Sequence, residues 1–165
     1  MNARKLTHLS LLTCVALILF AVEARLPDPV PIPGVKLGLA NIVTVYAVYR
    51  FRAGEAAMVL LARILLGGIF AGRAIALVYS LAGGAACLCG MLALRRAIPE
   101  RFLWISSVLG AALHNLGQMA AAVAITATPA VLVYLPFLLA SGCVAGAFTG
   151  ACACMAMRLG KKWNL

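Results

Sequence analysis

The chain is poor in acidic residues. Of its 165 residues, four are Asp or Glu and 14 are Lys or Arg, and only 11% carry a charge. The four carboxylates, Glu23, Asp28, Glu55 and Glu100, are scattered along the chain. Because magnesium on phosphate groups is held by clustered carboxylates, this composition argues against a metal-dependent phosphate-processing active site.

Several sequence motifs of enzymes are also absent. The chain has no Walker loop, no dinucleotide fingerprint, no zinc-binding helix and no aspartate-rich diphosphate motif. Neither cysteine pair, Cys87/Cys89 or Cys152/Cys154, can bind one metal ion by itself. Residues two apart on a helix point about 200° away from each other. We therefore expect no catalytic residue, no metal site and no cofactor, and we interpret the six cysteines as small apolar fillers.

Apolar residues are abundant. They make up 65% of the chain, a share far above that in soluble domains, and the mean hydropathy is +1.06. We predict one all-α domain over residues 1–165, an integral membrane bundle of six transmembrane helices. Each of the six apolar stretches that we assign to these helices comes close to the length that crosses about 30 Å of hydrocarbon. The expected spans are about 7–25, 36–51, 54–71, 73–94, 102–126 and 130–157.

Proline marks two places in this pattern. Pro136 should kink the last span or shift its start, because proline cannot donate a helical hydrogen bond. Prolines at every second position between 27 and 33 favour an extended path outside the hydrocarbon. This segment is either a semi-rigid cover over a pocket mouth or a simple connector.

Basic residues predict the orientation of the bundle. With alternating spans, one side carries ten of the 14 cations and should face the cytoplasm together with both termini. Since these cations flank the spans, we expect contact with membrane lipid and no nucleic acid partner. The expected location is the cell membrane of a bacterium, that is, its cytoplasmic membrane. The ten are Arg4, Lys5, Arg50, Arg52, Arg95, Arg96, Arg101, Arg158, Lys161 and Lys162.

The first span has a second interpretation. The residues "NARK" before an apolar core, and "VEA" at 22–24 after it, resemble a secretory signal with its cleavage site. Cleavage would remove Glu23 and leave five spans.

Four further cations lie on the outer side or within the membrane. An isolated cation in the middle of a span, as at Arg63, costs about 2.5 to 3.5 kcal/mol and needs a partner or a watery cavity. Arg25, Lys36 and Arg73 lie at outer span ends, where their side chains can also extend to the headgroups. These four cations outnumber the two anions expected on the outer side, Glu23 and Asp28. We expect Lys36, Asn41, Arg63 and Arg73 to line the binding site of an anionic small-molecule substrate.

The fifth span carries a polar stripe. Ser107, Ala111, His114 and Gln118 follow at helical spacing, with Asn115 beside them. At that depth such side chains either form interhelical hydrogen bonds or contact a substrate. We assign His114, Asn115 and Gln118 to the substrate site, with the hydrogen-bonding alternative left open.

Glycines at 142, 146 and 150 repeat at intervals of four in the last span. Such a pattern lets another helix approach closely, either within the chain or from a partner subunit.

These residues resemble a known family. Glu23, Leu26, Pro27, Pro33 and Gly34, then "KLGLANIV" at 36–43 and "RILLGG" at 63–68, are similar to the Gx transporter family, whose members are labelled heptaprenyl diphosphate synthase component I. Members of this family look similar to the S components of energy-coupling factor transporters, which are small six-helix membrane proteins.

The resemblance implies a noncatalytic protein that binds a vitamin-like or isoprenoid-precursor substrate from outside. Its expected partner is a transmembrane coupling subunit with ATPases. The alternative is a noncatalytic membrane subunit of a heptaprenyl (polyprenyl) diphosphate synthase, with the soluble synthase as its partner.

Overall fold

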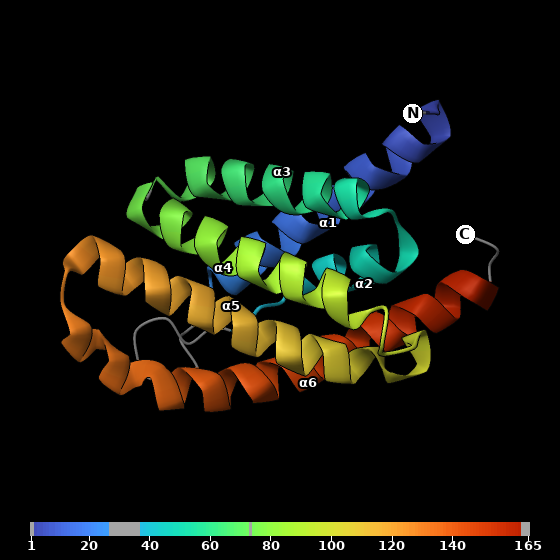
Figure 1. The fold of residues 1–165 in the computed structure, drawn as a ribbon. Helices are drawn as coiled ribbons and strands as arrows, with labels where there is room; N and C mark the ends of the chain where they lie inside the picture. The colour runs from blue at the N-terminus through green and yellow to red at the C-terminus, as the bar shows by residue number, and fades with distance from the viewer. Residues whose placement is uncertain (1, 27–36, 73, 163–165) are drawn as a thin grey trace.

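The computed structural model describes residues 2–26, 37–72 and 74–162, and within these ranges it is all-helical, as predicted (Figure 1). The elements are α1 (Ala3–Glu23), α2 (Asn41–Arg50), α3 (Ala53–Ala71), α4 (Ala74–Leu94), η1 (Glu100–Phe102), α5 (Leu103–Thr126), η2 (Pro129–Tyr134) and α6 (Leu135–Lys162). The proline segment 27–33 lies outside the described residues, so its role as cover or connector stays a prediction.

Five helical segments of the described chain are long and apolar enough to cross a membrane: Ala3–Glu23, Ala53–Ala71, Ala74–Leu94, Glu100–Thr126 and Pro129–Gly160. The chain is therefore a multi-pass membrane protein. Pro136 shifts the start of the last long helix, because α6 begins only at Leu135, after the 3-10 turn of η2.

The second predicted span, 36–51, differs from the prediction. Its described helix, α2, has 10 residues, which is about 15 Å and half of the hydrocarbon thickness. The physical reason is a turn at Gly38, whose φ of +69° is not helical. There the N–H of Asn41 donates to Gly38 O at 2.8 Å, and the helix starts after it.

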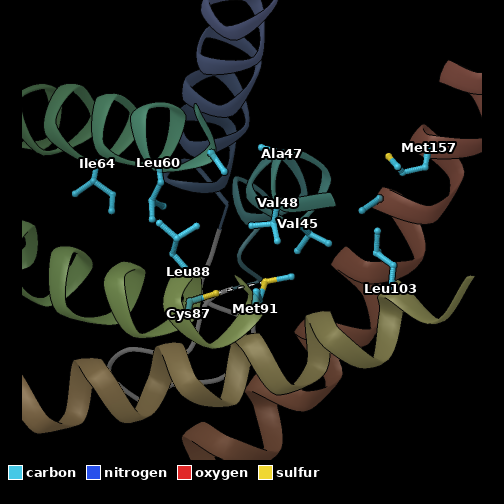
Figure 2. Packing of buried hydrophobic residues seen from close by; sticks show 12 residues of the cluster. Val45, Ala47, Val48, Leu60, Ile64, Cys87, Leu88, Met91, Leu103 and Met157 are labelled. Atoms are coloured by element: carbon cyan, nitrogen blue, oxygen red, sulfur yellow. Dashed lines mark hydrogen bonds between the residues drawn. The ribbon is translucent and has the colours of Figure 1, made fainter. Parts of the chain in front are cut away.

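The short helix α2 lies inside the bundle (Figure 2). Its side chains pack in one buried cluster with α3, α4, α5 and α6, where Met91 and Leu103 are fully buried. Its C-terminal end is also held, because Arg95 Nη1 donates to Val48 O at 2.8 Å and to Phe51 O at 3.2 Å. The cluster includes Val45, Val48, Leu60, Ile64, Cys87, Leu88, Met91, Leu103 and Met157.

The glycine repeat of α6 lies against α5 within the same chain. A Cβ added at Gly146 would come within 2.8 Å of Val108 Cα, and one at Gly150 within 2.7 Å of Trp104 Cα. Gly142 lies against Asn115 in the same way. The close approach is therefore intramolecular, with α5 between α4 and α6.

The helix α1 is attached more loosely. Leu9 and Ala16 pack against Val43 and Val59 in a small second cluster. Large apolar side chains recur on its outer side and are exposed, namely Leu11, Val15, Ile18 and Val22. In a bilayer this stripe faces lipid.

Both termini lie at the same end of the bundle, which also carries the α2–α3 and α4–α5 turns (Figure 1). Exposed arginines gather at this end: Arg4, Arg50, Arg52, Arg96, Arg101 and Arg158. There Lys5 Nζ also forms an ion pair with Glu55 Oε1 at 2.5 Å. The assignment of this end to the cytoplasm stays a prediction.

Candidate functional site

The predicted site residues divide into three groups. Lys36 and Arg73 lie outside the described residues. Asn41 and Arg63 meet at the start of α2, whereas the α5 residues contact other helices: His114 and Gln118 lie against α4, and Asn115 against α6. The geometry below begins with the buried cation.

Arg63 lies on α3, and its guanidinium reaches the first residue of α2. Arg63 Nη2 donates to Asn41 Oδ1 at 3.3 Å, which is a long hydrogen bond. The Nε atom of Arg63 is buried and has no partner among the described residues. Over the same ranges no ion pair joins Arg63 to a carboxylate. The cation is therefore incompletely paired at the depth where pairing matters most.

The start of α2 forms the second part of the site. The N–H of Gly38 donates to Glu23 Oε1 at 2.5 Å, and the N–H of Leu39 donates to Glu23 Oε2 at 3.0 Å. Successive N–H groups around a residue with positive φ form a concave anion-binding nest. The positive end of the α2 dipole lies directly behind these groups.

Glu23 is thus a site residue that the sequence analysis did not assign. It is the last residue of α1 and is half-buried. A signal was present, because Glu23 is the single charge between Lys5 and Arg25 and opens the family-like pattern. The sequence predicts only that Glu23 is an anion on the outer side, because nothing in it shows which N–H groups the carboxylate reaches.

The charged groups near the start of α2 come from different helices. Glu23 is the last residue of α1, and Arg63 lies on α3. Both reach the start of α2, Glu23 through Gly38 and Leu39 and Arg63 through Asn41.

The polar stripe of α5 meets two different neighbours. His114 and Gln118 lie against α4, where a Cβ added at Gly83 would be 3.0 Å from His114 Cε1 and 2.6 Å from Gln118 Cγ. Ser107 contacts α6 through a buried hydrogen bond to Thr149, with 3.1 Å between the hydroxyl oxygens. The stripe therefore divides its contacts between α4 and α6.

Asn115 forms an interhelical hydrogen bond. Its Nδ2 donates to Leu138 O on α6 at 2.5 Å, and Ser141 Oγ donates to the same carbonyl at 3.1 Å. The geometry therefore favours the hydrogen-bonding alternative for Asn115 over a contact with substrate.

A small cavity lies at the other end of α2, near the termini. It has a volume of about 60 Å³ and is lined by Tyr46, Tyr49, Arg50, Glu100, Met157 and Gly160. Its lining residues lie at the end of α2 opposite Asn41, so this cavity is separate from the surroundings of Arg63.

The histidines, cysteines and acidic residues of the described ranges form no group of three that could hold a metal ion. The two members of the first cysteine pair point apart as expected, since Cys87 is buried and Cys89 is exposed. Cys87 instead contacts the Met91 thioether, with 3.8 Å between the sulfur atoms (Figure 2).

Comparison with known families identifies the chain. The family model described as heptaprenyl diphosphate synthase component I matches residues 12–156, so the chain belongs to this family and the resemblance is confirmed. No curated protein and no solved structure matches the chain.

The position of Asn115 generates a stability prediction. Replacing Asn115 with Ala removes the bond to Leu138 O, and we expect the free energy of unfolding to fall by about 0.6 kcal/mol and at most about 1.7 kcal/mol, as for other interhelical hydrogen bonds in membranes. Thermal unfolding in detergent measures the change. The control is Leu116→Ala at the neighbouring exposed position. Equal melting temperatures of the two variants would contradict the structural role.

Proposed function

We propose that this member of the heptaprenyl diphosphate synthase component I family binds a small anionic or amphipathic molecule within the membrane and serves in its transport. The observation that carries this proposal is the incompletely paired Arg63 guanidinium beside the N-terminal end of a half-length helix. The substrate class is vitamin-like or an isoprenoid precursor with a carboxylate or phosphate group.

The energetic argument starts from the cost of a buried cation. A charge near the centre of a span costs about 2.5 to 3.5 kcal/mol even by lenient measures, and intramembrane charges therefore mark binding sites or ion paths. Asn41 offers Arg63 one neutral acceptor at 3.3 Å. An anionic group of a ligand would compensate the guanidinium more fully, because it supplies the opposite charge and can accept two parallel N–H···O bonds from the guanidinium.

The short second helix supports the same function. In many transporters, helices that are interrupted near the membrane midplane point their N-terminal ends at anionic substrate groups. The N-terminal end of α2 has this character, because α2 covers about half of the hydrocarbon and starts next to Arg63. His114 and Gln118 on α5, which lie against Gly83 of α4, would contact the remainder of the ligand.

The proposal treats the chain as noncatalytic. Prenyl diphosphate elongation holds its substrates through magnesium on clustered carboxylates. Here Glu23 binds backbone N–H groups at one end of the bundle, and Glu55 pairs with Lys5 at the other. Transport against a gradient would then need an external energy source, since the chain has no nucleotide-binding loop.

In this proposal the protein resides in the bacterial cytoplasmic membrane with both termini inside. The arginine-rich end of the bundle would face the cytoplasm, where a coupling subunit with ATPases would contact it. The opposite end, with Glu23 and the turn at Gly38, would face the exterior and admit the substrate.

The second candidate function is a noncatalytic membrane subunit of a polyprenyl diphosphate synthase. The description of the family favours it, because it names a component of such a synthase. Both functions can use the same anion site, since an isoprenoid diphosphate is an amphipathic anion. They differ in the partner.

The first prediction here concerns Arg63. We expect the full chain in lipid nanodiscs to bind geranyl diphosphate, and Arg63→Ala to weaken binding about tenfold or more, because a hydrogen-bonded charge contributes about 1.5 to 3 kcal/mol. Equilibrium binding of radiolabelled ligand measures this. The control is Arg25→Ala, which removes an exposed cation from the same end of the bundle. Unchanged affinity in Arg63→Ala would refute the site.

The second prediction concerns the partner. Purification of the tagged full chain from its native membrane in mild detergent should retain a membrane subunit with ATPases. Mass spectrometry identifies what is retained. Recovery of a soluble, carboxylate-rich synthase without ATPases would replace the transport function with the second candidate.

A further inference from the structure

The carboxylate of Glu23 occupies donors that could equally bind a foreign anion. The N–H groups of Gly38 and Leu39 converge on its two oxygens at 2.5 and 3.0 Å. Convergence depends on the left-handed conformation of Gly38, with φ at +69°, which turns two consecutive N–H groups toward one point. The same geometry would hold any group that has two oxygens on one centre, such as a carboxylate or a phosphate.

A second set of donors lies beside the first. The side chain of Asn41 separates them: its Oδ1 accepts from Arg63 Nη2 at 3.3 Å, and its Nδ2 lies 3.1 Å from the place a Cβ would take at Gly38. The backbone N–H pair and the guanidinium are therefore one amide side chain apart. The second set is incompletely used, because Arg63 Nε is buried without a partner among the described residues.

We propose that these donors form the two halves of one site for a diphosphate group and that Glu23 is a built-in competitor for it. One phosphate would bind Arg63, and the other would displace the carboxylate of Glu23 from Gly38 and Leu39. This inference rests on the proposed function and narrows its ligand class to molecules with two adjacent anionic centres.

Displacement would also change the attachment of α1. Glu23 is the last residue of α1, and its carboxylate is the link between that end and the start of α2. Other contacts of α1 include the Lys5–Glu55 ion pair at its opposite end, the apolar cluster with Leu9 and Ala16, and Phe20 against Gly67 of α3. Occupation of the site by a diphosphate would thus remove the Glu23 link while these contacts keep α1 in place.

Binding of inorganic pyrophosphate to the full chain in nanodiscs tests the proposal. We expect Glu23→Gln to lower the dissociation constant about tenfold, because the competing charge and one strong acceptor are lost. Glu23→Asp keeps the charge but shortens the reach, and it should lower the constant about threefold. Inorganic phosphate, which has one anionic centre, should gain less in both variants. The control is Glu55→Gln at the opposite end, with no change expected.

The outcomes separate this inference from the proposed function. If wild-type protein binds pyrophosphate and Arg63→Ala abolishes binding, but neither Glu23 variant binds more tightly, the competitor is refuted and the site stands. A gain in Glu23→Gln with wild-type affinity in Glu23→Asp also refutes displacement, since only the charge then matters. If no variant binds pyrophosphate but the wild-type protein binds geranyl diphosphate in an Arg63-dependent way, the two-part diphosphate site is refuted and the proposed function stands. If neither ligand binds, both proposals fail. Size-exclusion chromatography and thermal melting verify that each variant is folded.

Discussion

Backbone polar groups cannot remain unpaired in hydrocarbon, and this constraint governs the arrangement around α2. Gly38 has a non-helical conformation just before α2, so the N–H groups of Gly38 and Leu39 have no helical acceptor. The carboxylate of Glu23 supplies the acceptor from another helix. This one interaction joins the end of α1 to the start of α2, next to Asn41 and its partner Arg63.

The rest of the bundle provides a rigid frame for that region. Helices α4, α5 and α6 approach one another at glycines, and the Asn115 and Ser107 hydrogen bonds link α5 to α6. In contrast, α1 contacts α2 and α3 through a small apolar cluster, the Glu23 hydrogen bonds and the Lys5–Glu55 ion pair. A bundle with one firmly packed half and one loosely held helix suits a site whose ligand enters beside the loose helix.

Much of this fold can be predicted from hydropathy, because spans of sufficient length stand out in a chain this apolar. The half-length α2 could not be predicted, since residues 37–49 are mostly apolar and the turn depends on the conformation of Gly38. Arg63 and Asn41 were assigned to the site from their chemistry, and this assignment stays a prediction. The sequence does not show that these two side chains form a hydrogen bond across 22 positions, or that Asn115 donates to α6. Both contacts follow from the packing of helices, which periodicity does not encode.

The central claim is that an anion contacts the Arg63 guanidinium next to the N-terminal end of α2. Solid-state NMR of the full chain in lipid, with nitrogen-labelled arginine and bound pyrophosphate, measures phosphorus–nitrogen proximity directly. The account predicts a close contact in the wild-type protein that disappears in Arg63→Lys, because lysine has no guanidinium. Absence of the contact in wild type, or its persistence in Arg63→Lys, would contradict the account.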